Sequence, residues 1–163
     1  MGGIVQFNIP ENWVEKYEKN GGGEFYLDSP DSGTLRLNVI TLEKPENQEL
    51  NNQVLLEFSN DYISHSGVKT SSRQINDRVA IAQYDQAFVD RGQNIIIRFW
   101  IIANLVPPKN IRIATFSYTL LELRFNQPEF IEELAMLNSE IGNSKFSVIN
   151  NKTNQKPWWC FGK

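Results

Sequence analysis

Few side chains in this 163-residue chain could carry catalysis, and they lie apart in the sequence. His65 is the only histidine, so a Ser-His-Asp or Cys-His site would have to use it. It follows an expected helix, in Ser64-His-Ser-Gly67, without the glycine-flanked serine of a nucleophile elbow. A histidine at a helix end can simply interact with the helix dipole and solvent. We therefore predict no catalytic site at His65.

The sequence also has few residues that could carry thiol or metal chemistry. Cys160 is the only cysteine, which excludes an intramolecular disulfide and a cysteine-rich zinc site. No base lies near it in sequence, so we interpret it as a small apolar residue. Asp28, Asp31, Asp85 and Asp90 do not have the spacing of metal ligands. We predict no catalytic residue, no metal and no cofactor.

Carboxylates leave one enzymatic alternative open. Two carboxylates can hydrolyse a glycoside, but with nineteen acidic residues some pair is inevitable in any fold. Asp85 is notable because it follows Tyr84 in a largely apolar strand, on the same face as Val79 and Ile81. If buried there, it would have a perturbed pKa and could mark a site. A hydrolase or small-ligand binder with a carboxylate-lined cleft, using Asp85 or Asp28, is therefore the alternative function.

The stretch Gly21-Gly-Gly23 is typical of a flexible turn. A phosphate-binding loop would continue with Lys and Ser or Thr, whereas Glu24 follows here. We do not predict phosphate binding at this turn.

Aromatic side chains near both ends of the chain are candidates for contact with a partner. The C-terminal stretch Trp158-Trp-Cys-Phe161 is the most unusual in composition. Aromatic residues are enriched at interface hot spots, but packing such a tail onto the sheet would also contribute about 1.5–3 kcal/mol per large side chain. Both readings remain open. The predicted partner-binding residues are Trp13, Tyr17, Asp28, Asp31, Trp158 and Trp159.

Composition limits the class of protein. The net charge is −3 and the isoelectric point is about 5.2, which argues against a nucleic-acid or anionic-membrane surface. No apolar run approaches the roughly 20 residues needed to span a bilayer, and the first residues do not resemble a secretion signal. We expect a cytoplasmic protein with a single domain over residues 1–163, in which residues 150–163 form an aromatic tail.

Residues 94–122 are expected to form the centre of the fold. Two arms rich in β-branched and aromatic residues flank Pro107-Pro108, as in a β-hairpin. In the first arm Ile97 and Phe99 fall on one face, and Trp100 and Ile102 fall on the other. Because both faces are apolar, the hairpin should lie in a sheet that is covered on both sides.

The remaining elements follow from hydrophobic periodicity and turn residues. We predict strands at 4–8, 24–28, 34–42, 69–75, 78–88 and 146–149, with the last and 69–75 near sheet edges. A helical turn is expected at 11–17, and helices at 48–63 and 127–141. The apolar stripe of the first helix is Leu50, Val54, Phe58 and Tyr62, widened by Leu55. That of the second is Phe130, Leu134, Leu137 and Ile141.

The opening stretch Val5-Gln-Phe-Asn-Ile-Pro-Glu-Asn-Trp13 resembles the start of PsbP-like proteins, which read strand, Ile-Pro, two residues, Trp. The order of elements over residues 4–141 is also similar to theirs. The stretch from Gly21 to Val39 further resembles one bacterial family of that superfamily. The resemblance implies an α+β fold, namely a three-layer α/β/α sandwich on a mainly antiparallel sheet. Its members include a photosystem subunit and a Ran-binding factor, but none of their partner-contact residues can be placed on this chain.

Together these patterns favour a non-enzymatic protein-binding or adaptor module. We expect it to engage another protein through a face of the sheet or through the loops around Gly21–Gly33. A homodimer that pairs through an exposed edge strand or the aromatic tail is a further possibility. Neither nucleic acid nor membrane is an expected partner.

Overall fold

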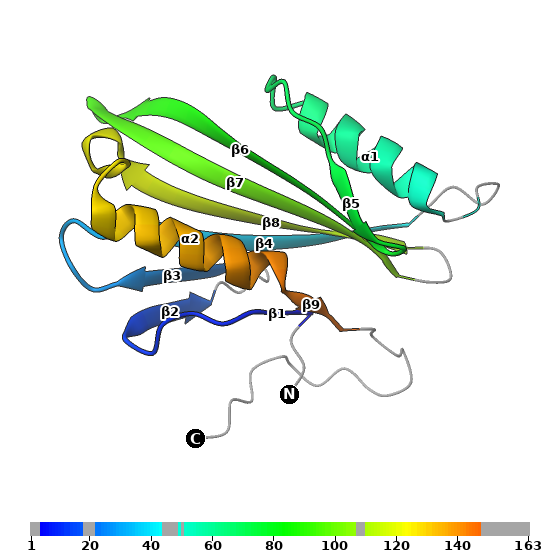
Figure 1. The fold of residues 1–163 in the computed structure, drawn as a ribbon, viewed down its shortest axis with the longest axis horizontal. Helices are drawn as coiled ribbons and strands as arrows, with labels where there is room; N and C mark the ends of the chain where they lie inside the picture. Colours follow the sequence, from blue (N-terminus) through cyan, green and yellow to red (C-terminus); the bar gives the residue numbers. More distant parts are fainter. Residues whose placement is uncertain (1–3, 18–21, 44–48, 50, 107–109, 148–163) are drawn as a thin grey trace.

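The computed structural model describes residues 4–17, 22–43, 49, 51–106 and 110–147. Within these residues a seven-stranded antiparallel sheet runs in the order β2-β3-β4-β8-β7-β6-β5 (Figure 1). The predicted α+β fold, a three-layer sandwich on an antiparallel sheet, is confirmed. Its strands are β2 (Trp13–Tyr17), β3 (Gly23–Leu27), β4 (Thr34–Glu43), β5 (Arg73–Asn76), β6 (Val79–Asp90), β7 (Gln93–Val106) and β8 (Asn110–Leu121).

The helical segments complete the domain. They are α1 (Asn52–Ser64), the short 3-10 helix η1 (Glu122–Arg124) and α2 (Pro128–Gly142). A separate two-stranded sheet pairs β1 (Val5–Gln6) with β9 (Lys145–Phe146). The strand predicted at 146–149 begins one residue earlier, at Lys145, and pairs outside the main sheet. Residues 148 and 149 of that prediction lie outside the described residues.

The hairpin β7–β8 lies at the centre of the sheet, as the sequence predicts. Trp100 and Ile102 point into the core beneath α2, whereas Ile101 and Ala103 point into the core beneath α1. All four side chains are buried. Successive residues of a strand face opposite sides, so one apolar strand supplies both cores.

Helix α2 packs with the predicted face. Phe130, Leu134, Leu137 and Ile141 are its buried residues. The indole Nε1 of the buried Trp100 donates a hydrogen bond of 2.7 Å to Oδ1 of Asn138, which fixes the helix over the centre of the sheet. An indole N–H needs such a partner when it is buried.

Helix α1 is rotated relative to the prediction. Its fully buried residues are Leu55, Ser59 and Ile63, whereas Phe58 and Tyr62 of the predicted stripe are only half-buried. The prediction was wrong about the centre of this face because Ser59 is polar. The Ser59 hydroxyl lies 2.6 Å from the Ser72 hydroxyl, so it can be buried without losing its hydrogen bond.

The helical turn predicted at 11–17 is wrong, because Trp13–Tyr17 is strand β2. Trp13 and Tyr17 are four residues apart, a spacing that puts both on one face in a strand as well as in a helix. The backbone pairs with β3 from Trp13↔Leu27 to Tyr17↔Gly23. Cross-strand pairing therefore decides the conformation of this segment.

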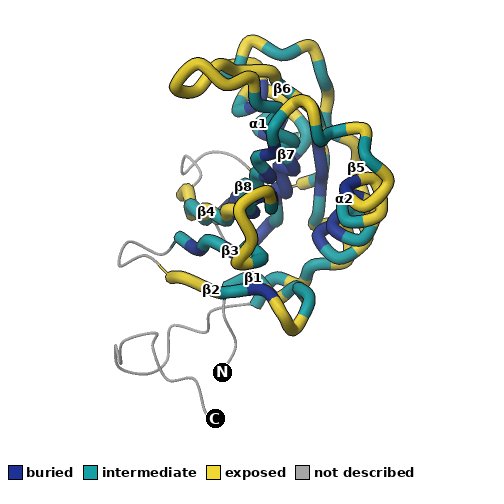
Figure 2. The backbone as a smooth tube through the Cα atoms, turned by 90° about the vertical axis from the view of Figure 1, so that its left-hand side faces the viewer, coloured by how far each residue is buried: buried dark blue, intermediate teal, exposed yellow. Residues whose placement is uncertain are grey.

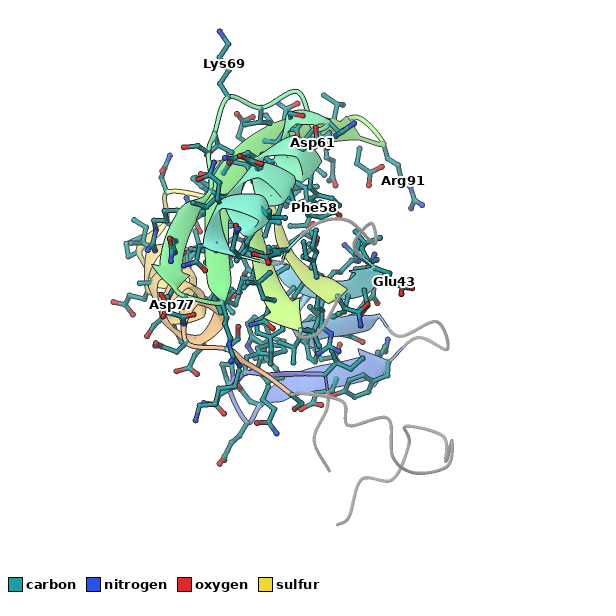
Figure 3. All side chains as sticks on the ribbon, turned by 90° about the vertical axis from the view of Figure 1, so that its right-hand side faces the viewer. Glu43, Phe58, Asp61, Lys69, Asp77 and Arg91 are labelled. Carbon is teal, nitrogen blue, oxygen red and sulfur yellow. The ribbon has the colours of Figure 1, made fainter. Side chains whose placement is uncertain are left out.

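Two turns at the ends of β6 are short. Arg91 and Gly92 have positive φ values of 48° and 80°, which suit a two-residue hairpin loop that matches the strand twist. Arg91 projects from the tip of this β6–β7 hairpin, at the far end of β6 from Asp77 (Figure 3). On the other side of the turn at Asp77, β5 is the exposed edge strand that the sequence predicts.

Candidate functional site

Helix α1 covers only one end of its face of the sheet (Figure 1). Its buried residues pack against Ala80, Ala82, Ile101 and Ala103, and its last turn reaches Thr115, where the two hydroxyls of Tyr62 and Thr115 lie 3.4 Å apart. Strands β6, β7 and β8 continue beyond this point, and the residues of β6 and β7 at their hairpin end are exposed (yellow in Figure 2).

We call the α1-side residues at and beyond the end of α1 the open face. Strand alternation and register place them there, because Phe116, Tyr118 and Leu35 of the same strands point into the core under α2. Helix α1 contacts the open face at one end, where Tyr62 lies beside Thr115 and Tyr84 packs against the cluster that contains Leu55 and Ile63. It comprises Glu24, Thr34, Arg36, Asn38, Tyr84, Gln86, Phe88, Ile95, Ile97, Phe99, Thr115, Ser117, Thr119 and Leu121.

The half of the open face on β6 and β7 is apolar. Tyr84 and Phe99 are register partners, and their rings stack with centroids 5.0 Å apart at an interplanar angle of 25°. Ile95 and Ile97 are half-buried, and Phe88 is 39% exposed. These side chains form a largely apolar surface with aromatic residues at both ends, Tyr84 and Phe99 next to α1 and Phe88 near the hairpin, while Gln86 and Ile97 lie between them. Aromatic side chains are enriched in protein interfaces.

The half on β3, β4 and β8 is polar and hollowed. A pocket of about 310 Å³ is lined by Gly22, Gly23, Glu24, Arg36, Leu37, Asn38, Thr115 and Ser117. Arg36 Nε donates a hydrogen bond of 2.8 Å to Glu24 Oε1, so the charges of these two side chains balance at the rim. Further along the same face, the Lys16 ammonium lies 4.9 Å from the centroid of the Tyr26 ring.

No protein-family model and no curated protein matches this chain. Several solved structures match this chain. A protein from Bacteroides thetaiotaomicron matches with a TM-score of 0.59 and 16% identity, over 92% of this chain and 47% of that one. LpqN of Mycobacterium tuberculosis, which is involved in cell envelope biogenesis, matches with a TM-score of 0.60 and 10% identity, over 88% and 83%. This chain therefore spans about half the length of the Bacteroides protein.

The chain has the fold of LpqN and of the Bacteroides protein. The resemblance expected from the opening Ile-Pro and Trp13 is confirmed at the level of fold. The Ran-binding protein Mog1p of Saccharomyces cerevisiae also matches, with a TM-score of 0.48 and 10% identity over 88% of this chain and 90% of its own. At these identities the comparisons establish the architecture alone.

Asp85, the carboxylate singled out in the sequence, lies on the α2 side of the sheet. Both of its oxygens accept hydrogen bonds of 2.7 Å, from Nε and Nη2 of its cross-strand partner Arg98. The guanidinium of Arg98 also lies 5.2 Å from the centroid of the Phe125 ring. Asp85 is thus held in a bidentate ion pair, and neither it nor Asp28 lines the pocket. The carboxylate that does line it is Glu24.

The loop between β3 and β4 is tied to the start of α2. Asp31 accepts a hydrogen bond of 2.6 Å from Nη2 of Arg124, whose Nη1 donates to Gln127 at 2.9 Å. Asp28 is exposed in the same loop. Asp31 therefore has a structural partner inside the chain, while contact of either aspartate with another protein remains a prediction.

The aromatic candidates differ in exposure. Trp13 is only 8% exposed and stacks on Tyr118 with ring centroids 6.4 Å apart, so its side chain is part of the core. Tyr17 is 47% exposed and donates a hydrogen bond of 2.5 Å to Glu15. Partial burial, together with Glu15, raises the pKa of Tyr17 to about 12. Trp158 and Trp159 lie outside the described residues.

Sequence reasoning missed a buried phenol–carboxyl pair. The hydroxyl of Tyr118 donates a hydrogen bond to Glu133 of α2, and burial raises the pKa of both groups. The hydrogen bond from Tyr118 acts the other way on Glu133, but burial is the larger effect. Gly33 and Trp13 pack on the same tyrosine. The pair therefore joins α2 to the sheet on the side away from the open face.

The open face itself was also missed. One signal for it was available, because Thr115, Ser117 and Thr119 alternate with buried residues along β8. A strand with one apolar and one hydroxyl-bearing face has a solvated side. Among the described residues there is no group of three potential metal ligands, and none of the helices is both long and apolar enough to cross a membrane.

Proposed function

We propose that this chain is a non-enzymatic module that binds another protein through the apolar half of the open face. One observation carries the proposal, namely that α1 ends before the sheet does, so that Phe88, Ile95, Ile97 and Phe99 lie outside the core clusters that the two helices cover. Contiguous apolar surface that is rimmed by polar residues is typical of interaction sites.

The arrangement has the anatomy of a protein interface. It offers three aromatic side chains, Tyr84 and Phe99 at its α1 end and Phe88 at its hairpin end, and aromatic anchors contribute much of the binding energy of interfaces. The charged side chains Arg36 and Glu24 lie at the margin, paired with each other. Burying apolar surface contributes roughly 25 cal/mol per Å², and a stable interface buries about 800 Å² on each partner. A partner would therefore have to cover the polar half as well.

Two contacts support a role without catalysis. His65 has a structural partner at the end of α1, where its Nδ1 lies 2.7 Å from the carbonyl oxygen of Asp61. Asp85 forms an ion pair with Arg98. We also infer from its composition that the protein acts in the cytoplasm. The experiment below would also detect a second copy of the chain as the partner.

The test compares two neighbouring residues of β6 that face opposite sides. Phe88→Asp puts a charge on the open face, whereas Val89→Asp puts the same charge on the other face at the same end of the strand. Tagged wild-type and variant proteins are used to capture partners from native lysate, and each captured protein is identified and its binding repeated with purified components.

We expect a partner that binds the wild type and the Val89→Asp variant with similar affinity and binds Phe88→Asp at least about tenfold more weakly, as for loss of a hot-spot residue. Thermal unfolding of both variants checks that they are folded. Equal binding by all three proteins, or no reproducible partner for the wild type, would count against the proposal.

A further inference from the structure

The polar half of the open face carries a ladder of hydroxyl and amide groups. Register places Thr34 opposite Thr119, Arg36 opposite Ser117 and Asn38 opposite Thr115 across β4 and β8. These two strands lie near the centre of the sheet, and the pocket of about 310 Å³ is hollowed over them. That volume is at the lower end of the range for small-molecule sites.

Much of the hydrogen-bonding capacity in this pocket is not used by the protein. In the part of the chain that the structure describes, the side chains of Asn38 and Ser117 make no hydrogen bond to protein. Thr115 has only the long 3.4 Å contact with Tyr62. Arg36 uses one of its nitrogens for Glu24, whose second oxygen is left for other donors. The pocket therefore offers donors and acceptors side by side.

The charge and the neighbours of the pocket narrow the ligand class. Arg36 and Glu24 are paired, so the lining carries no net charge that would select an anion or a cation. Phe99 is the register partner of Ser117 and stacks on Tyr84, so an aromatic pair borders the hydroxyl groups. An extended peptide would pair with the backbone of a sheet edge, whereas this pocket presents side chains from the middle of a sheet.

We propose that this pocket binds a neutral sugar. The ring hydroxyls of a sugar both donate and accept hydrogen bonds, which matches Ser117, Asn38 and the second oxygen of Glu24. Its less polar C–H face would lie toward Phe99. The pocket borders the apolar surface and shares Phe99 with it, so a bound protein and a bound sugar would exclude each other. The two proposals are tested with different ligands and different variants, so the failure of one can be told from the failure of the other.

The test is a titration of the ¹⁵N-labelled full-length chain, followed by two-dimensional NMR. The probes are glucose, galactose, mannose, N-acetylglucosamine, maltose and cellobiose, each up to about 100 mM, well above the millimolar range of weak complexes. Sodium phosphate and glucuronate are titrated in parallel. We expect at least one neutral sugar to cause saturable shifts in the Asn38 side-chain amide and in the backbone amides of Gly23 and Ser117.

Two variants localise the effect. Asn38→Leu and Ser117→Val each remove hydrogen-bonding groups, and we expect each to weaken binding about fivefold to tenfold, as for loss of one or two hydrogen bonds. Asn38 is exposed, so its replacement keeps the test valid even if Ser117→Val does not fold. Val89→Asp, on the other face, should bind as the wild type does.

Three results would overturn the proposal. They are the absence of saturable shifts with all six neutral sugars, shifts with phosphate or glucuronate only, and sugar-induced shifts that Asn38→Leu leaves unchanged. None of them bears on capture of a protein by the surface around Phe88.

Discussion

Among the glycines that the structure describes, Gly33 is the one whose replacement by alanine should destabilise the protein most. A Cβ at position 33 would overlap Cζ and Oη of Tyr118 and would lie 2.6 Å from Cε2 of the same ring. The ring cannot move aside easily, because Tyr118 is buried, stacked on Trp13 and hydrogen-bonded to Glu133. The methyl group therefore forces apart the β3–β4 loop, strand β8 and helix α2.

The size of the effect follows from two contributions. Overpacking of a well-packed core costs about 1–3 kcal/mol. If the phenol is displaced from Glu133, a half-buried carboxyl loses its donor, which costs about 1–3 kcal/mol more. We therefore expect a loss of about 2–6 kcal/mol, against a total free energy of unfolding of about 5–15 kcal/mol for a domain.

The assay is urea unfolding followed by tryptophan fluorescence. With a slope of about 1–3 kcal/mol per molar urea, the midpoint of Gly33→Ala should fall by roughly 1–3 M. Gly142→Ala is the matched control, since an added Cβ there meets nothing within 4 Å. Alanine is the better helix former, so this control should be unchanged or more stable by up to about 1 kcal/mol.

A second variant separates the clash from a general loss of loop structure. In the Gly33→Ala background, Tyr118→Leu should cost less than it does in the wild type, because it removes the ring that the new methyl group meets. A Gly33→Ala protein within about 0.5 kcal/mol of the wild type, or strictly additive costs in the double variant, would refute the argument that Tyr118 is held against Gly33.

Two further predictions concern charged groups. Burial raises the pKa of Glu133 in the folded protein, so the stability that its protonated form contributes is fully present below the ordinary value of 4.5 and is lost as pH rises through the raised value. In urea unfolding between pH 4 and 8, the free energy of unfolding should therefore decline less for Glu133→Gln than for the wild type. An identical pH profile for the two proteins would contradict this. The Asp85–Arg98 ion pair is part-exposed, so a double-mutant cycle with Asp85→Asn and Arg98→Gln should give a coupling free energy of only about 0.5–1 kcal/mol, which weakens as salt is added. A coupling free energy above about 3 kcal/mol would indicate a buried pair instead.

Where sequence reasoning succeeded, the signal was local. The stripe of Phe130, Leu134 and Leu137 repeats at the helical period over one uninterrupted helix, and the structure buries those residues. The alternating apolar faces of 95–103 likewise predicted cover on both sides, and the two helices provide it for Trp100 and Ile101. The prediction did not hold for Ile95, Ile97 and Phe99, which lie on the open face. The predicted boundaries of both helices lie within a few residues of those observed.

Where it failed, the answer lay in pairing between distant segments. Residues 13–17 became a strand because Gly23–Leu27 offered a partner. Ser59 of α1 could be buried because Ser72 lies beside it. Asp85 received its partner from the register of β6 against β7, which aligns it with Arg98. None of these partners can be identified from one segment alone.

The sequence by itself determined the elements and which side of each is apolar, because alternation and helical periodicity are properties of a short segment. Only the tertiary structure decided where α1 ends on the sheet, and with it which residues of β4, β6, β7 and β8 are left uncovered. That boundary depends on how a helix packs on a sheet whose neighbouring strands can be far apart in the chain. Arg112 of β8 and Thr41 of β4, for example, are joined by a hydrogen bond although they are 71 positions apart. The candidate site is a consequence of that packing and has no sequence motif of its own.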